Sequence, residues 1–552
     1  MSRSAHWDAI VVGGGHNGLV AGAYLARAGA KTLILEARTK AGGAADTSAP
    51  FADHPDVKVS TYSYVMSLMP TTIVRDLKLE RYGYRVFPSG SYYQAWPDGS
   101  SLKMHAGNPA SSYEQIARFS RRDAEAMGRW DEWMDGTAKV LSPLLMTVPP
   151  NLGSKSPSDL LETLALAWRF RSLDNRRVAD ITRLFTMSIS DLLDEWFESP
   201  QVKSCLAVNG LIGTWAGPHD SGTAYVMAHH SIGGVSMPGG HYWGVPEGGM
   251  GAVADAILRS GQASGAETRT SARVSKVLTR SGQAYGVALE SGEEILGSVI
   301  ITTVHPKIAF LEHLDPAELP PEFVRAVQNW KSRSGVVKIN LLISELPSFR
   351  ADPGTDVQEH HTGAVELCLS SDYCDRAFQD ARSGRAAARP FVDGSIPTTL
   401  DPTLAPDGLH VFSMFSQWVP HEWSERPHRE ELEAYADRAI DGYDELAPNF
   451  KGSVIARQVI GPHDMEQDLG MIGGNIFHGE LTPHQLFHMR PAPGYADYRT
   501  PVRGLYQASS ATHGGGGVTG IPAHLAVKQV VRERRIGALK EVTRKLSRGS
   551  HV

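Results

Sequence analysis

The chain has 552 residues, of which 41% are hydrophobic and 21% are charged, and its formal net charge is −6. This length is too great for one ordinary hydrophobic core and predicts at least two domains, and the composition is that of a soluble globular protein. The negative charge, with no basic stretch interleaved with aromatic residues, excludes an evident nucleic-acid surface. No run of about eighteen apolar residues predicts a membrane span, and the first strand begins too early for a signal peptide to precede it.

The cysteines and histidines limit the chemistry further. Cys205, Cys368 and Cys374 form no C-x-x-C pair, which argues against a dithiol–disulfide flavoenzyme, and three thiols cannot hold a four-cysteine iron–sulfur cluster. A reducing cytoplasm is the expected location. His484 and His488 are four residues apart on a segment expected to be helical. No third ligand of recognisable spacing accompanies them, so we predict no metal site.

A glycine-rich motif follows the first apolar run. Residues 8–12 lead into Gly13, Gly15 and Gly18, spaced as G-x-G-x-x-G, and an alanine-rich segment of helical composition comes next. Gly13 can adopt the positive φ that a tight strand-to-helix turn requires. Gly15 leaves room for a pyrophosphate to approach the backbone, and Gly18 lets the helix lie close to the strand. The N-terminus of that helix then faces the phosphates.

A second apolar run supports this interpretation. Residues 31–35 end at Glu36, eighteen residues after Gly18, and an acid at about this distance accepts hydrogen bonds from a ribose hydroxyl. Gly42 and Gly43 follow, as expected of a loop that passes close beneath the same cofactor. A tight turn without a ligand is the alternative, but together these features predict a dinucleotide site.

The elements that follow alternate between strand-like and helical patterns. In chain order they are a β-hairpin over 84–104, a largely helical stretch over 113–243, a glycine loop and helix over 245–258, strands at 272–278, 284–289 and 295–302, a strand at 336–343 within an otherwise loop-rich region, a helix at 429–446, and a final strand, glycine loop and helix over 504–531. The strand-like residues up to 302 are expected to return the chain to the first sheet.

Dinucleotide-type elements thus occur in three separate parts of the chain. We predict an α/β protein with a discontinuous Rossmann-like FAD-binding domain and an inserted α+β substrate domain. FAD is favoured over NAD(P) because neither later glycine loop completes a second motif, and because a tightly held flavin can store electrons between half-reactions. The predicted boundaries are 1–75, 240–312 and 470–535 for the FAD-binding domain, 76–239 and 313–469 for the substrate-binding domain, and 536–552 for a basic tail.

Four segments occur in a fixed order: GGGHNGLVAGAYLARAG, VPEGGMGAVADAI, GGNIFHGELTPHQLFHMRP and GLYQASSATHGGGGVTG. Together they resemble the phytoene-desaturase-like branch of the amine oxidase superfamily. More narrowly, they resemble the group named after pyridine nucleotide-disulphide oxidoreductase domain protein 2. The resemblance implies a two-domain fold of the glutathione-reductase/amine-oxidase type with the flavin at the domain interface. It also implies noncovalent FAD, and the last motif contains no cysteine that could form a thioether.

The resemblance also implies the cofactor contacts. It places Gly13, Gly15 and Gly18 on the pyrophosphate, Glu36 on the adenosine ribose, the backbone of Val274 on adenine, and Gly516, Gly517 and Val518 beneath the flavin pyrimidine, at the opening of the closing helix. A helix N-terminus there can stabilise negative charge on the reduced ring.

Three polar residues near these motifs are further cofactor candidates. His16 and Asn17 lie where side chains can reach the phosphates or the flavin edge, although Asn17 acting as a helix cap is the alternative. Ser510 is also a candidate, and it stands about where amine oxidases tend to carry an acid, which weakens an amine oxidase assignment.

The favoured activity is a dehydrogenation that makes a carbon–carbon double bond in a hydrophobic, isoprenoid or cyclic substrate. Flavin N5 takes a hydride, and a base takes a proton from the neighbouring carbon. The candidate catalytic residues are His478, Glu480, Arg490 and His513, each with a structural hydrogen bond as its alternative role. Lys338 is a candidate for binding a substrate carboxylate or water, with a rim lysine as the alternative.

Two other functions stay open from the sequence: an FAD-dependent amine oxidase, and a non-redox lipid- or prenyl-binding protein of the same fold. Without a second nucleotide domain, the expected electron acceptor is oxygen, a quinone or a carrier. A homo-oligomer is compatible with the sequence. Residues 528–548 carry eight Lys or Arg against two Glu, which predicts either peripheral contact with the inner face of a membrane or packing on an acidic protein surface.

Overall fold

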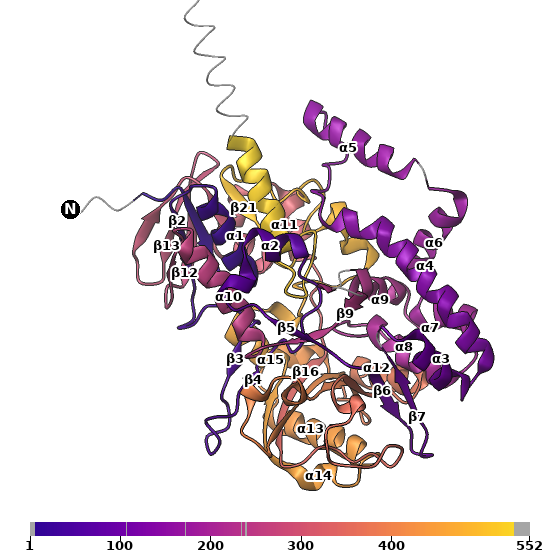
Figure 1. The fold of residues 1–552 in the computed structure, drawn as a ribbon. Helices are drawn as coiled ribbons and strands as arrows, with labels where there is room; N and C mark the ends of the chain where they lie inside the picture. The colour runs from indigo at the N-terminus through magenta and orange to yellow at the C-terminus, as the bar shows by residue number, and fades with distance from the viewer. Residues whose placement is uncertain (1–5, 106, 172, 233–234, 238–239, 535–552) are drawn as a thin grey trace, which may run out of the picture.

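The structure, a computed structural model, describes residues 6–105, 107–171, 173–232, 235–237 and 240–534. A five-stranded parallel sheet, in the order β11-β2-β1-β15-β21, organises one half of the molecule (Figure 1). Its strands are Ala9–Val12 (β1), Thr32–Leu35 (β2), Glu267–Arg269 (β11), Ile300–Thr302 (β15) and Leu505–Gln507 (β21). They come from three separate stretches of the chain, which confirms the discontinuous Rossmann-like fold.

Both faces of this sheet are covered, so its strands read as continuous apolar runs. Ala9 and Val11 of β1 pack into a core with helices α1 (His16–Arg27) and α10 (Met250–Ala263). Ile10 and Val12, which point the other way, pack against an antiparallel meander. Its strands are Val274–Arg280 (β12), Gln283–Leu289 (β13) and Glu294–Leu296 (β14). The predicted strand 295–302 is therefore two strands in two sheets, and residues 297–299 connect the meander strand β14 to β15 of the parallel sheet.

A seven-stranded sheet organises the other half, in the order β20-β16-β19-β18-β17-β6-β7. Its strands are Tyr92–Ala95 (β6), Ser101–Met104 (β7), Val336–Ile343 (β16), Ala364–Leu367 (β17), Phe391–Ser395 (β18), His410–Gln417 (β19) and Val454–Ile460 (β20). The predicted strand 336–343 and the hairpin of β6 and β7 are confirmed. Of the strands between 313 and 470, only β16 was predicted, and β17 to β20 were missed.

The remaining elements complete the two halves. The helices are Thr71–Asp76 (α2), Pro109–Ala117 (α3), Arg121–Leu145 (α4), Pro157–Phe170 (α5), Asn175–Thr186 (α6), Ile189–Trp196 (α7), Pro200–Ala207 (α8), Thr223–Ile232 (α9), Pro321–Gln328 (α11), Ser371–Arg382 (α12), Arg429–Asp444 (α13), Phe450–Ser453 (α14) and Pro462–Leu469 (α15). Short strands are Thr47–Ser48 (β3), Val59–Ser60 (β4), Val86–Pro88 (β5), Val235–Met237 (β8), Gly240–Tyr242 (β9) and Gly244–Pro246 (β10). A closing helix runs from 521 through 534.

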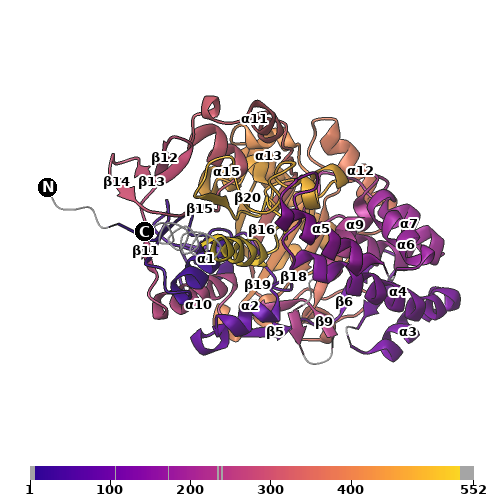
Figure 2. The same cartoon turned by 90° about the horizontal axis from the view of Figure 1, so that it is seen from above.

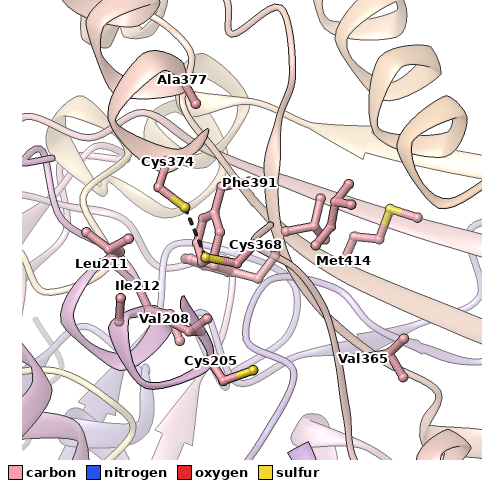
Figure 3. Packing of buried hydrophobic residues seen from close by; sticks show 14 of the residues in the cluster. Cys205, Val208, Leu211, Ile212, Val365, Cys368, Cys374, Ala377, Phe391 and Met414 are labelled. Atoms are coloured by element: carbon pink, nitrogen blue, oxygen red, sulfur yellow. Dashed lines mark hydrogen bonds between the residues drawn. The ribbon is translucent and has the colours of Figure 1, made fainter. Parts of the chain in front are cut away.

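Helices α3, α4 and α6 to α9 gather on one side of the molecule, next to the seven-stranded sheet, whereas α5 lies nearer the closing helix (Figure 1). Helices α3, α4 and α6 to α9 share one hydrophobic core with that sheet, in which Figure 3 shows Cys205 of α8 together with Phe391 and Met414 of the sheet. The Sγ atoms of Cys368 and Cys374 lie 3.1 Å apart in this core. Within the described part of the chain, no helix is both long and apolar enough to cross a bilayer.

Candidate cofactor site

A cavity of about 510 Å³ lies at the carboxyl ends of the parallel strands. Its lining includes Val12 at the end of β1, Leu35 at the end of β2 and Thr303 just after β15. Crevices outside the carboxyl ends of parallel strands are where open α/β sheets bind their ligands. The residues from Glu466 to Ile472 close the cavity from the side of the seven-stranded sheet.

The first glycine loop forms one wall of the cavity. Gly13 has the positive φ, +97°, that the turn was predicted to need. A Cβ on Gly18 would lie 1.8 Å from the carbonyl oxygen of Gly13, so helix α1 can approach the turn this closely only with glycine there. Around Gly15 the situation is different: the nearest described atom to a Cβ would be Gly43 Cα, at 3.8 Å. The backbone at Gly15 is therefore open toward the cavity.

The second glycine pair supports the first loop. The Gly42 N–H donates to the Gly14 carbonyl at 2.8 Å, and a Cβ on Gly43 would lie 3.0 Å from Gly15 Cα. Gly43 also lines the cavity. The predicted closeness of this loop to the first motif is therefore present in the fold.

Glu36 stands at the end of β2 and is buried beside the cavity. Its Oε2 accepts a hydrogen bond from the Gly14 N–H at 2.7 Å, and its Oε1 accepts one from the Arg38 N–H at 2.8 Å. Each carboxylate oxygen can accept a second bond. Val274 lines the same cavity, and the nearby Ala272 N–H donates to the Glu36 carbonyl at 2.8 Å, so Glu36 and this segment border one compartment.

Several polar atoms at the cavity are buried without a partner. His16 Nε2, Asn17 Oδ1 and His478 Nδ1 find no hydrogen-bond partner among the described residues, although all three residues line the cavity. Asn17 Nδ2 donates to Ser510 Oγ at 3.4 Å, and it does not cap helix α1, whose N-cap is Gly15. Buried polar groups normally have partners, so this set indicates a polar ligand.

The imidazoles at the cavity are neutral near pH 7. Burial lowers the pKa of His16 to about 4. Burial, followed by the nearby His16 and Arg490, lowers the pKa of His478 to about 3. His305, which the sequence analysis did not single out, has its ring 5.6 Å from that of His478. Neutral imidazoles can accept a proton or donate one hydrogen bond each.

Arg490 joins the two C-terminal motifs rather than facing the cavity. Its buried guanidinium donates to the carbonyls of Phe477 at 2.8 Å and Ser510 at 2.9 Å, and to those of Thr512 and Gln485 at 3.2 Å. Burial lowers its pKa to about 10. The side chain therefore fixes the position of Ser510, which does line the cavity.

Two other catalytic candidates make comparable structural contacts. Glu480 is buried and pairs with Arg333, with Nε–Oε1 at 2.6 Å and Nη2–Oε2 at 3.0 Å. His513 Nε2 lies 2.8 Å from the Leu144 carbonyl oxygen. Neither residue belongs to the cavity lining formed by the described residues. Of the four catalytic candidates, that lining contains His478 and does not contain Glu480, Arg490 or His513.

The residues expected beneath the flavin ring lie outside that lining as well. Gly516 packs so closely on Phe477 that a Cβ would lie 2.8 Å from its ring. Gly517 and Val518 both have a positive φ, +88° and +56°. The sequence predicted that these residues open the closing helix. The helix begins at residue 521, so they precede it and do not form its first turn.

Lys338 is neither a rim lysine nor a group at the cavity. It is fully buried in the middle of β16, and its Nζ donates to Ser413 Oγ at 2.6 Å and to Asn340 Oδ1. Burial lowers its pKa to about 7. Its partners lie on the same strand and on β19, so it is a core polar group of the seven-stranded sheet.

A buried acid pair on this sheet was missed by the sequence analysis. Asp393 on β18 and Glu366 on β17 are directly opposed, and the Tyr64 hydroxyl donates to Asp393 Oδ2. Neither oxygen of Glu366 has a hydrogen-bond partner among the described residues. Burial raises the pKa of Asp393 to about 6, and burial with the nearby Asp393 raises that of Glu366 well above its ordinary value. The sequence does carry a sign of this pair, because each of the two short strands contains one acidic residue beside apolar ones, in AVEL and in FVDGS.

The acid pair faces the cofactor half of the molecule. Phe415 is opposed to Asp393 across the sheet and stacks on Tyr64 at 5.4 Å between ring centroids. The neighbouring Ser63 donates its N–H to the carbonyl of Ala44 at 3.2 Å, and Ala44 lines the cavity. The pair therefore lies behind a segment that borders the candidate cofactor site.

For a metal, the described residues offer no group of three or more His, Cys, Asp or Glu side chains. His484 and His488, which were expected on one helix, lie in two separate 3₁₀ turns, Pro483–Gln485 and Phe487–Met489.

Comparison with known proteins places this site in a family. Residues 205–441 match the family described as flavin containing amine oxidoreductase, and residues 11–96 match an NAD(P)-binding Rossmann-like domain. Pyridine nucleotide-disulfide oxidoreductase domain-containing protein 2 of Rattus norvegicus is 37% identical, over 96% of this chain and 94% of its own. A limonene dehydrogenase polypeptide of Castellaniella defragrans is 25% identical, over 97% of this chain and 96% of its own. In fold, the chain is similar to putrescine oxidase bound to putrescine, with a TM-score of 0.58, 15% identity, and coverage of 96% and 99%.

Proposed function

Because the chain belongs to the flavin-containing amine oxidoreductase family, we propose that it is an FAD-dependent dehydrogenase that makes a carbon–carbon double bond in a hydrophobic substrate. The observation that carries the proposal is the cavity in which an open Gly15 backbone is combined with unpaired polar atoms of His16, Asn17 and His478. FAD supplies the acceptor for a hydride.

The residues at the cavity fit FAD. Gly15 and the N-terminus of helix α1 would hold the pyrophosphate, Glu36 would accept bonds from the adenosine ribose, and Val274 would border the adenine. We propose that the cofactor is noncovalent, since the three cysteines are all buried away from the cavity lining.

The chain must also take up the proton that the substrate loses. We infer that His478 does this, because its imidazole lines the cavity with an unpaired Nδ1, and an unprotonated ring nitrogen can accept a proton. Arg490 and Glu480 hold the loops around it, through bonds to the Phe477 carbonyl and to Arg333. They act as positioning residues, as does His513.

The substrate class follows from two observations. The limonene dehydrogenase polypeptide, which is similar over nearly the whole chain, is named for a cyclic terpene hydrocarbon. Ser510 lines the cavity about where amine oxidases tend to carry an acid. Both favour an isoprenoid or cyclic hydrocarbon over an amine.

Amine oxidation is the second candidate, and the acid pair favours it. One proton shared between Asp393 and Glu366 would leave a buried negative charge behind Tyr64, and a protonated amine would neutralise it. The structural likeness to putrescine oxidase supports the fold and not this activity. A non-redox lipid- or prenyl-binding role is the third alternative, and it predicts a colourless protein.

Flavin reduction separates these functions. We expect the purified protein to be yellow, to release its flavin into the supernatant on acid precipitation, and to bleach anaerobically with a monocyclic terpene hydrocarbon. Putrescine and simple primary amines serve as the comparison, at matched concentrations. Bleaching by amines alone would establish the second candidate. A yellow colour that stays with the precipitated protein would contradict noncovalent binding.

The source and fate of the electrons give a further prediction. With no second nucleotide domain predicted, NADPH is expected not to reduce the flavin rapidly, whereas dithionite reduces it fully and oxygen, a quinone or a carrier reoxidises it. Stopped-flow absorbance under anaerobic conditions measures this. Stoichiometric reduction by NADPH within seconds would overturn the proposed direction of electron flow.

A further inference from the structure

Helix α5 turns its apolar side toward solvent. Leu160, Leu161, Leu164 and Trp168 are 51%, 68%, 65% and 67% exposed. Their spacing places them on one face of the helix, because residues three, four and seven apart lie above one another. An amphipathic helix on a globular protein normally packs this face on the core. A clustered apolar face of this kind marks a surface that binds something.

The polar side of α5 holds it in this orientation. Asp159 Oδ1 lies 3.5 Å from Arg499 Nη2, and Glu162 pairs with Arg532 of the closing helix. Arg169 donates to Thr147 Oγ1 at 3.3 Å. These polar contacts fix the helix on the protein with its leucines and tryptophan outward.

A basic groove runs along the same helix. It has a volume of about 220 Å³ and lies between α5 and the closing helix, which are neighbours in both views (Figures 1 and 2). Arg169, Lys528 and Arg532 line it, together with Glu162, which is already paired with Arg532. Beyond this end of the closing helix the sequence adds five Lys or Arg and one Glu over 535–552, outside the described residues.

We propose that this face, which we call the α5 face and define as Leu160, Leu161, Leu164 and Trp168 with the adjoining basic groove, docks on a membrane that contains anionic lipids. The apolar side chains of such a face can enter the acyl region of a bilayer, the tryptophan suits the headgroup interface, and the flanking basic groups attract anionic headgroups. A second protein copy would account for the apolar residues but not for the positive charge around them. The inference is independent of the reaction proposed above.

This assigns the membrane contact to a different element from the one the sequence suggested. The C-terminal tail is rich in Lys and Arg but contains no Trp or Phe, so by itself it offers charge and few large apolar side chains. Helix α5 supplies that area, and the tail adds attraction to anionic headgroups of about 1 kcal/mol per basic residue near the surface.

Vesicle flotation of the full-length, flavin-loaded protein tests the proposal. We expect it to float with phosphatidylcholine vesicles that contain phosphatidylglycerol, more weakly with phosphatidylcholine alone, and less as salt is raised. Leu161→Glu/Leu164→Glu and Trp168→Glu are each expected to lower the partition coefficient by at least about tenfold, because an inserted side chain becomes charged. Arg169→Gln/Lys528→Gln should reduce the preference for the anionic vesicles, since the basic residues of the tail remain.

Val357→Glu is the matched control, since Val357 is 54% exposed in a loop of the seven-stranded sheet half, and it should float like the unaltered protein. Flavin content and melting temperature show that each variant is folded. The proposal is wrong if the unaltered protein does not float with anionic vesicles, or if Val357→Glu weakens flotation as much as Trp168→Glu.

Two further outcomes would give the α5 face a different role or assign membrane binding to a different segment. If the α5 variants split a dimer and leave flotation unchanged, the α5 face is a protein interface. If Lys540→Gln/Arg544→Gln/Lys545→Gln abolishes flotation while the α5 variants do not, the tail carries the binding. Either result overturns the proposal.

Discussion

A Gly15→Val variant is expected to fold and to lose its flavin. Gly15 has an ordinary φ of −68°, and the closest described atom to an added Cβ is Gly43 Cα at 3.8 Å. The chain therefore tolerates a side chain that the cofactor does not, because the side chain would fill the space where a pyrophosphate meets the backbone. We expect FAD affinity to fall by on the order of a hundredfold, about 3 kcal/mol. Fluorescence titration of FAD into the apoprotein measures it.

Two other glycines separate loss of cofactor from loss of fold. Gly18→Ala puts a Cβ 1.8 Å from the Gly13 carbonyl oxygen, so it should lower the melting temperature of the apoprotein itself, whereas Gly15→Val should not. Gly128→Ala, on helix α4, has no described atom within 4 Å of the new Cβ and should leave both flavin content and stability intact. A Gly15→Val protein that stays fully yellow would mean that the pyrophosphate is not bound at this turn.

The parts of the fold that the sequence could predict are those determined by neighbouring residues. The turn at Gly13 and the strand Val336–Ile343 follow from local pattern and were located correctly. Strands β17, β18 and β19 were missed because they are buried almost throughout, and strands covered on both faces show no strict alternation of polar and apolar residues. The edge strand β20 is partly exposed, but its sequence VIARQVI does not alternate either. In Phe391–Ser395, for example, all five residues are buried, although the sequence reads FVDGS.

The same distinction holds for the site. Gly15, Asn17 and Glu36 lie within one supersecondary unit, so their positions at one cavity could be inferred from spacing. Lys338 and Glu480 could not be placed in this way, because their partners, Ser413 and Arg333, are distant in the sequence. A charged residue in an apolar segment indicates a special environment, but only the fold shows whether the partner is a substrate or the protein.

The acid pair should make the protein less stable at high pH. The pKa of Asp393 is raised from 3.8 to about 6, so folding takes up a proton between these values and stability falls as pH rises through them. The total loss from Asp393 is on the order of 3 kcal/mol, roughly half of it between pH 5 and pH 8. Glu366, whose pKa is raised further, adds to the loss in the same direction. Urea unfolding at pH 5 and pH 8 measures it.

Glu366→Gln/Asp393→Asn removes both titrations while keeping the size of the side chains, so the variant should be more stable than the unaltered protein at pH 8 and differ less at pH 5. The other titratable groups that face the pair are Tyr64, Tyr92, Cys205, Cys368 and Tyr443, and all are retained. Asp407→Asn, an exposed acid before β19, should leave the pH dependence unchanged. Equal pH dependence in the double variant and the unaltered protein would show that the pair is not the source.

The same double variant also separates the two candidate reactions. If a hydrocarbon is the substrate, the pair is a structural feature of the sheet, and anaerobic bleaching should persist with an unchanged KM. If an amine is the substrate, loss of the buried negative charge behind Tyr64 should raise the KM for the amine by at least about tenfold. The gain in stability is expected for either reaction, so it serves as the control that the double variant is folded. The KM of the folded variant then shows whether the acid pair binds the substrate.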